Sequence, residues 1–150
     1  MHKILIKSIL CYGSVTWTLT QKAEQMLSTF ERKILRRIYG PKLEWGYWRP
    51  RLNSELYSLY NEPNVVKDIE ITILGCAGHI MRMEEERIPK KVLKGNFYTT
   101  RSLGRPRIRW TDVVQRDALQ LLGIRGWRRR AEIRDDWRRL MREVKTRKGL

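Results

Sequence analysis

Apolar residues recur every three or four positions along most of the chain, and this spacing predicts helices rather than strands. The clearest stretch begins after Thr18 or Thr20 and ends at Tyr39, before Gly40. Thr18 and Gln21 have the spacing of a capping box, in which two side chains accept hydrogen bonds from unpaired backbone N–H groups at the start of a helix. The apolar stripe of this predicted helix consists of Met26, Leu27, Phe30, Ile34, Leu35 and Ile38.

The same spacing predicts helices over residues 1–11, 53–60, 65–83, 89–93 and 110–122, and two more within 125–144. Asn53, Asn64 and Asp135 are expected to cap the helices that follow them. Gly75 and Gly78 lie inside a predicted helix, where each costs about 1 kcal/mol relative to alanine. Close packing of another helix is therefore expected at both glycines.

Three segments interrupt the helical pattern. Residues 12–18 read as a turn or a short extended segment, and residues 42–52 as an aromatic and basic loop. A longer loop follows Gly95 and ends near Trp110. The predicted fold class is mainly α: a short helical bundle with basic loops, divided into 1–18, 19–95 and 96–150.

The charge balance narrows the range of partners. The chain has 32 Lys and Arg against 16 Asp and Glu, which gives a formal net charge of +16. A folded chain with this excess is expected to bind an anionic partner, and nucleic acid, RNA or DNA, is the commonest one. A solvated basic surface or a structural role beside a polyanion is the alternative.

Basic residues gather in three places where they can contact phosphate. The stretch Ser102–Trp110, SLGRPRIRW, places arginines in an extended loop, and guanidinium groups bind phosphate oxygens and base edges in a bidentate way. The helix before Gly40 has a basic side, and the stretch after Gly123 is the most basic of the chain. The candidate nucleic-acid-binding residues are Arg105, Arg107, Arg109, Arg128, Arg129, Arg130, Arg32, Lys33, Arg36 and Arg37.

The loop at 42–52 interleaves Trp45, Tyr47 and Trp48 with arginines. Such a loop either stacks bases on its rings or folds back over the core, and the sequence leaves both open.

Other functions have little support in the sequence. No stretch is apolar enough to span a membrane, and two cysteines do not make a disulfide framework. Cys76 and His79 have the spacing of half a zinc site, but the other residues of that kind, His2 and Cys11, do not form a second pair. We therefore expect no metal, no cofactor and no enzymatic activity of the chain itself.

Several blocks taken together resemble a known family. YGSVTWTLT, FERKILRRIYGP, AGHIMRM, IPKKVL, GRPRIRW and GWRRRAEIRDDWRRLMREV, in this order and spacing, resemble the C-terminal part of the reverse transcriptase of non-LTR (LINE-type) retrotransposons. The resemblance implies that residues 1 to about 17 are the end of the polymerase thumb. It also implies a helical basic region beyond the thumb, with the remainder of the reverse transcriptase in cis.

The resemblance further implies that this chain lacks the polymerase centre. That centre uses aspartates in a strand hairpin to bind metal ions, whereas Asp135 and Asp136 lie among arginines in a helical pattern. The family's role and the charge imply a nuclear location or a cytoplasmic ribonucleoprotein. In the family, position 76 is commonly tryptophan and position 75 basic, and Cys76 and Gly75 here indicate a decayed copy.

Two alternatives remain open at the level of sequence. One is a free-standing DNA-binding module in which GRPR enters a minor groove. The other is an inactive pseudogene product that exposes the apolar face of its first helix.

Overall fold

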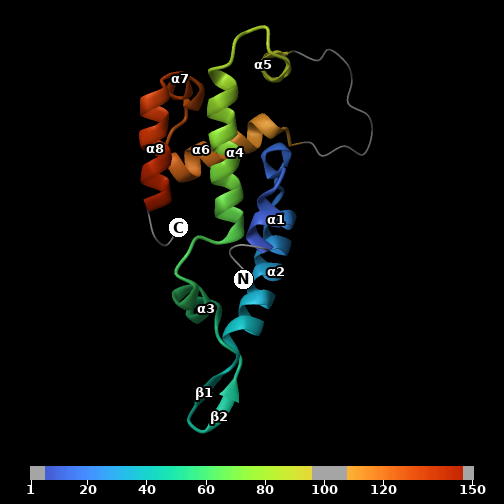
Figure 1. The fold of residues 1–150 in the computed structure, drawn as a ribbon, viewed down its shortest axis with the longest axis vertical. Helices are drawn as coiled ribbons and strands as arrows, with labels where there is room; N and C mark the ends of the chain where they lie inside the picture. The colour runs from blue at the N-terminus through green and yellow to red at the C-terminus, as the bar shows by residue number, and fades with distance from the viewer. Residues whose placement is uncertain (1–5, 96–107, 147–150) are drawn as a thin grey trace, which may run out of the picture.

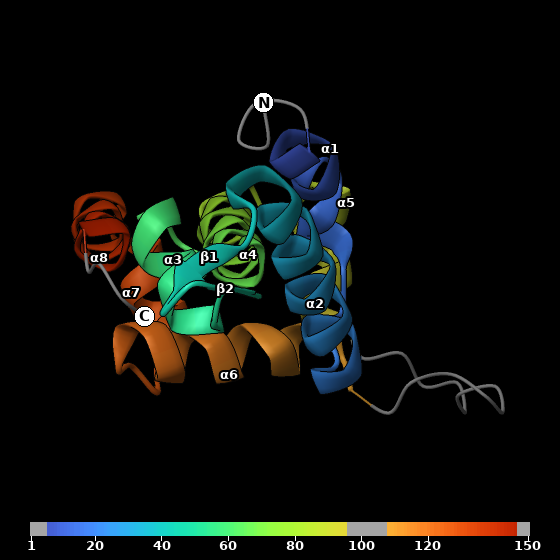
Figure 2. The same cartoon turned by 90° about the horizontal axis from the view of Figure 1, so that it is seen from below.

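A single central helix, α4 (Val65–Met81), organises the fold. The computed structural model describes residues 6–95 and 108–146. Figures 1 and 2 show α4 between α2 (Gln21–Tyr39) on one flank and α8 (Arg134–Thr146) on the other, with α6 (Trp110–Leu122) lying across them. The remaining elements are α1 (Lys7–Cys11), a 3₁₀ turn η2 (Ser14–Thr16), β1 (Lys42–Glu44), β2 (Tyr47–Arg49), α3 (Asn53–Tyr60), α5 (Ile88–Lys94) and α7 (Trp127–Glu132).

The core forms around α4 because this helix is apolar on almost every side. Ten of its 17 residues are buried, and side chains from α6, α7 and α8 pack against them. Leu19, before α2, joins the same cluster. The predicted mainly α fold is confirmed, and the buried core draws on residues of 19–95 and 96–150, with Leu10 and Cys11 packed against it.

Gly78 lets α8 approach α4 closely. A Cβ atom built on Gly78 would lie 2.1 Å from Nε1 of Trp137, whose indole is buried. No side chain can occupy that space while Trp137 keeps its position. The prediction of close packing is therefore confirmed at Gly78 and wrong at Gly75, where a Cβ would meet nothing within 4 Å.

Three side chains hold the first turn of α4. The buried carboxylate of Glu31, on α2, accepts a hydrogen bond from the backbone N–H of Val65 at 3.0 Å, and Asn64 accepts one from Lys67 at 2.9 Å. Lys7, on α1, pairs with Asp68. The first backbone donors of a helix have no partner inside the helix, so these contacts satisfy donors and tie α1 and α2 to α4.

Of the two caps that the sequence predicted for α2, Thr20 is confirmed, because it accepts a hydrogen bond from Ala23, whereas Thr18 does not cap the helix. Two other predictions at the helix ends are wrong. Asn53 lies inside α3, and the cap is provided by Glu55, which accepts from the backbone N–H of Leu52. Asp135 lies in the first turn of α8 with an exposed side chain and caps nothing that the structure records.

Of the two forms predicted for residues 12–18, the turn is confirmed, because residues 14–16 form the 3₁₀ turn η2. Two other segments differ from the sequence predictions. The loop at 42–52 contains an antiparallel hairpin. The apolar stripe of α2 is only partly buried: Leu35 faces the core, whereas Met26, Phe30 and Ile38 are exposed.

The two glycines of α4 make a matched pair of tests. Gly78→Ala should lower the free energy of unfolding by about 1–3 kcal/mol, because the methyl group overpacks the contact with Trp137. Gly75→Ala should raise it by up to about 1 kcal/mol, because alanine favours the helix and the space is open. Urea unfolding measures both, and equal effects of the two substitutions would contradict this packing.

Glu31→Ala should lower the free energy of unfolding by about 1–3 kcal/mol, because it leaves the N–H of Val65 buried without an acceptor. Glu31→Gln should cost less, since an amide oxygen can still accept that hydrogen bond.

The same carboxylate should make stability depend on pH. Burial raises the pKa of Glu31 above its usual value, outweighing the contacts that lower it. The folded chain therefore takes up a proton before the unfolded chain does as the pH falls. Wild-type stability relative to Glu31→Gln should rise as the pH falls through the raised pKa, and should level off below the ordinary glutamate pKa of about 4.3. Urea unfolding of both chains across this range checks the effect, and a difference independent of pH would contradict it.

Candidate nucleic-acid interface

Four basic residues of α8 form a row along one face. Arg134, Arg138, Arg142 and Lys145 are spaced by four, four and three residues, which places them on neighbouring turns of a helix. All four are exposed, whereas Trp137 on another face of α8 is buried. Burial of the apolar face therefore fixes the direction in which the basic row points.

A groove runs between α4 and α8 beside this row. Its volume is about 1010 Å³, and α4 provides Ile71, Thr72 and Gly75 to its wall. We call it the α4–α8 groove. Its charged lining residues are Arg82, Arg138, Arg142 and Lys145, with Asp68 and Asp135.

Arg82 brings a further guanidinium to this groove from the C-terminal end of α4. Its Nη1 donates a hydrogen bond to the backbone oxygen of Ala131 at 2.6 Å. Burial, and then the positive charges of Arg134 and Arg138, lower the pKa of Arg82. Three cations from two helices thus lie close enough to repel one another, and an anion bound among them relieves that repulsion.

The acidic residues of the groove neutralise little of this charge. Asp68 is engaged by Lys7, and Asp135 lies 4.0 Å from Arg138 with an exposed carboxylate. Within residues 6–95 and 108–146, no ion pair involves Arg142 or Lys145. The groove therefore has a net positive charge, and Arg142 and Lys145 keep N–H donors for an external anion.

Arg128, Arg129 and Arg130 of α7, which the sequence predicted as phosphate contacts, differ in how far other side chains already engage them. All are exposed, but Arg130 donates to Asp136 at 2.8 Å, and that carboxylate also accepts from Arg139. Arg128 lies over the ring of Trp127, with Cζ 5.3 Å from the ring centroid. Arg128 and Arg129 keep donors for an external anion, whereas Arg130 joins α7 to α8.

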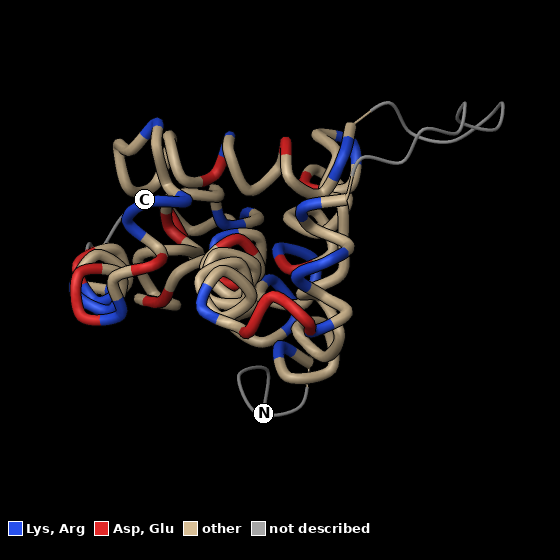
Figure 3. Tube along the Cα trace, turned by 90° about the horizontal axis from the view of Figure 1, so that it is seen from above, with Lys and Arg blue, Asp and Glu red and all other residues tan. Residues whose placement is uncertain are grey.

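The four basic residues predicted on α2 lie on the opposite flank of α4 from α8, so the predicted residues form two surfaces and not one. Figure 3 shows Lys and Arg on both flanks. Lys33 and Arg37 are exposed. Arg32 donates to Thr29 at 3.1 Å, and Arg36 donates to Asn53 at 2.7 Å.

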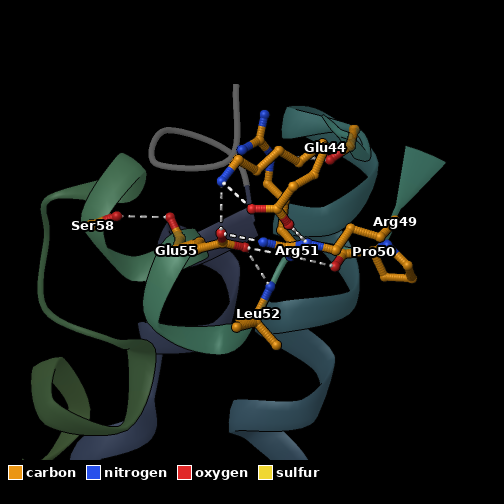
Figure 4. A network of polar contacts seen from close by, with 9 residues as sticks. Glu44, Arg49, Pro50, Arg51, Leu52, Glu55 and Ser58 are labelled. Atoms are coloured by element: carbon orange, nitrogen blue, oxygen red, sulfur yellow. Dashed lines mark hydrogen bonds and ion pairs between the residues drawn. The ribbon is translucent and has the colours of Figure 1, made fainter. Parts of the chain in front are cut away.

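The hairpin beyond α2 is held by ion pairs on one face. Lys42 pairs with Glu44 and Glu55, and Arg49 pairs with the same two carboxylates (Figure 4). Hydrogen bonds from Arg49 and from the backbone of Leu52 lower the pKa of Glu55 to about 2. The network fixes the hairpin to the start of α3.

The other face of the hairpin is open. Leu43 lies opposite Trp48 in the register, and both are exposed. Trp45 occupies the turn with φ of 53°, beside Gly46 with φ of 82°, and is 94% exposed. Of the two uses that the sequence left open, folding back over the core is wrong.

Part of the predicted central loop lies outside the described residues. Arg105 and Arg107 belong to that part, so their role remains a prediction. Arg109 is exposed and immediately precedes α6, where its backbone N–H donates to Asp112 at 2.8 Å.

Sequence reasoning missed the groove residues on α4 and α8. The spacing of Arg134, Arg138, Arg142 and Lys145 is a signal that could have identified the basic row. Arg82 had no such signal, because its position beside α8 depends on how the two helices pack.

Within the described residues, no group of three or more His, Cys, Asp or Glu side chains lies together in a way that could hold a metal ion. In the same part of the chain, no helix is long and apolar enough to cross a membrane.

No protein-family model, curated protein or solved structure matches this chain.

Proposed function

We propose that this chain binds nucleic acid and that the α4–α8 groove is a principal contact with the phosphate backbone. The observation that carries the proposal is that Arg82, at the end of α4, lines the same groove as Arg138, Arg142 and Lys145 of α8. Basic rows on solvated helices are common, but a row that meets a further arginine across a groove provides donors from two sides. The net charge of +16 supports the same partner.

A second set of exposed arginines lies on α7. Arg128 and Arg129 belong to a helix that packs on both α4 and α8. Together with the groove they provide phosphate contacts of the kind that fix position along a strand without reading its sequence. We therefore propose binding that depends on salt and little on sequence.

We further propose that the chain is the C-terminal part of a non-LTR retrotransposon reverse transcriptase, without a catalytic centre of its own. The ordered blocks from YGSVTWTLT to GWRRRAEIRDDWRRLMREV support this ancestry. In the parent protein the chain would hold template RNA or target DNA beside the polymerase, in the nucleus or a cytoplasmic ribonucleoprotein. The helix from residue 7 to residue 11 would then be the end of the thumb.

The proposal predicts which basic side chains contribute to nucleic-acid affinity. Arg138→Ala and Arg142→Ala should each weaken binding to RNA and to duplex DNA. Each should also lower the slope of log affinity against log salt by about one unit. The measurement is fluorescence anisotropy of labelled oligonucleotides over a range of salt concentrations.

Arg87→Ala is the matched control, because it removes the same charge from an exposed position outside the groove. It should leave the slope nearly unchanged. An equal loss in all three variants would mean that net charge and not the groove determines binding, which would contradict the proposed site.

A further inference from the structure

A small pocket at the base of the hairpin combines an aromatic wall with three arginines. Its volume is about 350 Å³. We call it the hairpin pocket. Its lining residues are Arg36, Gly40, Pro41, Trp48, Arg49, Pro50 and Arg51. It lies at the end of α2 and is separate from the α4–α8 groove, with which it shares no lining residue.

Trp48 presents its ring to solvent in this pocket. The side chain is 68% exposed, although tryptophan is usually well buried in folded proteins. The ion pairs of Lys42 and Arg49 with Glu44 and Glu55 lie on the other face of the hairpin. They hold the backbone that carries Trp48 against the start of α3. An exposed and supported indole is a platform on which a flat ring can stack at little cost in entropy.

Two arginines beside Trp48 keep donors for an anion. Arg51 uses Nε to donate to the backbone oxygen of Gly40 at 3.2 Å, and Arg36 uses Nη2 to donate to Asn53. Each guanidinium has five N–H donors, so most remain available. Neither arginine forms an ion pair with a carboxylate within the described residues, whereas Arg49 is taken up by Glu44 and Glu55.

The chemistry of the pocket selects its occupant. An apolar partner would suit the indole but would leave the two cations without an anion. An acidic peptide would suit the arginines but would leave the indole exposed. An unpaired nucleotide satisfies both, because its base has a π-face and its phosphate accepts bidentate hydrogen bonds from guanidinium.

We propose that the hairpin pocket binds one unpaired nucleotide of a single-stranded nucleic acid, with the base stacked on Trp48 and the adjacent phosphate held by Arg36 and Arg51. The inference rests on the proposed nucleic-acid binding and adds a preference for single strands over duplex. A base inside a duplex is already stacked on its neighbours, so it cannot lie on Trp48. RNA and DNA single strands share this chemistry.

The test compares Trp48→Ala with Trp45→Ala in the full chain, using short labelled single-stranded RNA, single-stranded DNA and a blunt duplex. Trp48→Ala should weaken binding of the single strands by roughly 5- to 100-fold and leave duplex binding unchanged. Its salt slope should stay constant, because no charge is lost. Trp45 does not line the pocket, so Trp45→Ala should change affinity by less than about twofold, well below the loss of a stacked base.

Two further arms separate stacking from other effects. Trp48→Tyr should restore most of the affinity, because a phenol ring still stacks. An abasic single strand keeps its phosphates and loses its bases, so wild type and Trp48→Ala should bind it equally. The RNA and DNA arms show which single strand the pocket prefers.

The outcomes distinguish this inference from the proposed function. If wild type binds single strands and Trp48→Ala binds them equally well, or if Trp45→Ala loses as much as Trp48→Ala, the pocket assignment is overturned while nucleic-acid binding stands. If the folded wild-type chain binds no nucleic acid at low salt, both are overturned. Circular dichroism melting verifies that each variant is folded.

Discussion

The burial of α4 is the constraint on which the rest of the structure depends. This helix is apolar around most of its circumference, so it must be covered on several sides, and α1, α2, α6, α7 and α8 all pack against it. Gly78 sets how closely α8 approaches, through its contact with the indole of Trp137. Glu31 sets where α2 meets the start of α4. The positions of both basic surfaces follow from these two contacts.

The distribution of charge follows from how the acidic residues are used. Many of the 16 carboxylates form internal contacts: Glu31 caps α4, Glu44 and Glu55 fix the hairpin, and Asp136 joins α7 to α8. Asp117 is buried beside Arg116, and burial raises the pKa of Asp117. Carboxylates engaged in this way do not neutralise the exposed arginines of α8. The fold therefore concentrates its excess positive charge on the surface.

The sequence was sufficient for those features that depend on local periodicity. It predicted the mainly helical fold, the approximate bounds of α2, α4 and α6, and the cap at Asn64. The sequence was not sufficient for features that tertiary contacts determine. Gly75 and Gly78 look alike in sequence, although only Gly78 faces Trp137. Arg82 joins the candidate site only through helix packing. The sequence named Trp48 as one of three rings that could stack bases, but the exposure of its ring depends on the hairpin, which extends beyond the core.

The most direct test of the account is the binding of the purified, folded chain to single-stranded RNA, RNA/DNA hybrid and duplex DNA across a range of salt concentrations. The account predicts binding to all three at low salt, with affinity that falls steeply and linearly on a log–log scale as salt rises. Single strands should keep an advantage over duplex at the highest salt, because stacking is not screened. A folded chain that binds none of the three at low salt would contradict the central claim.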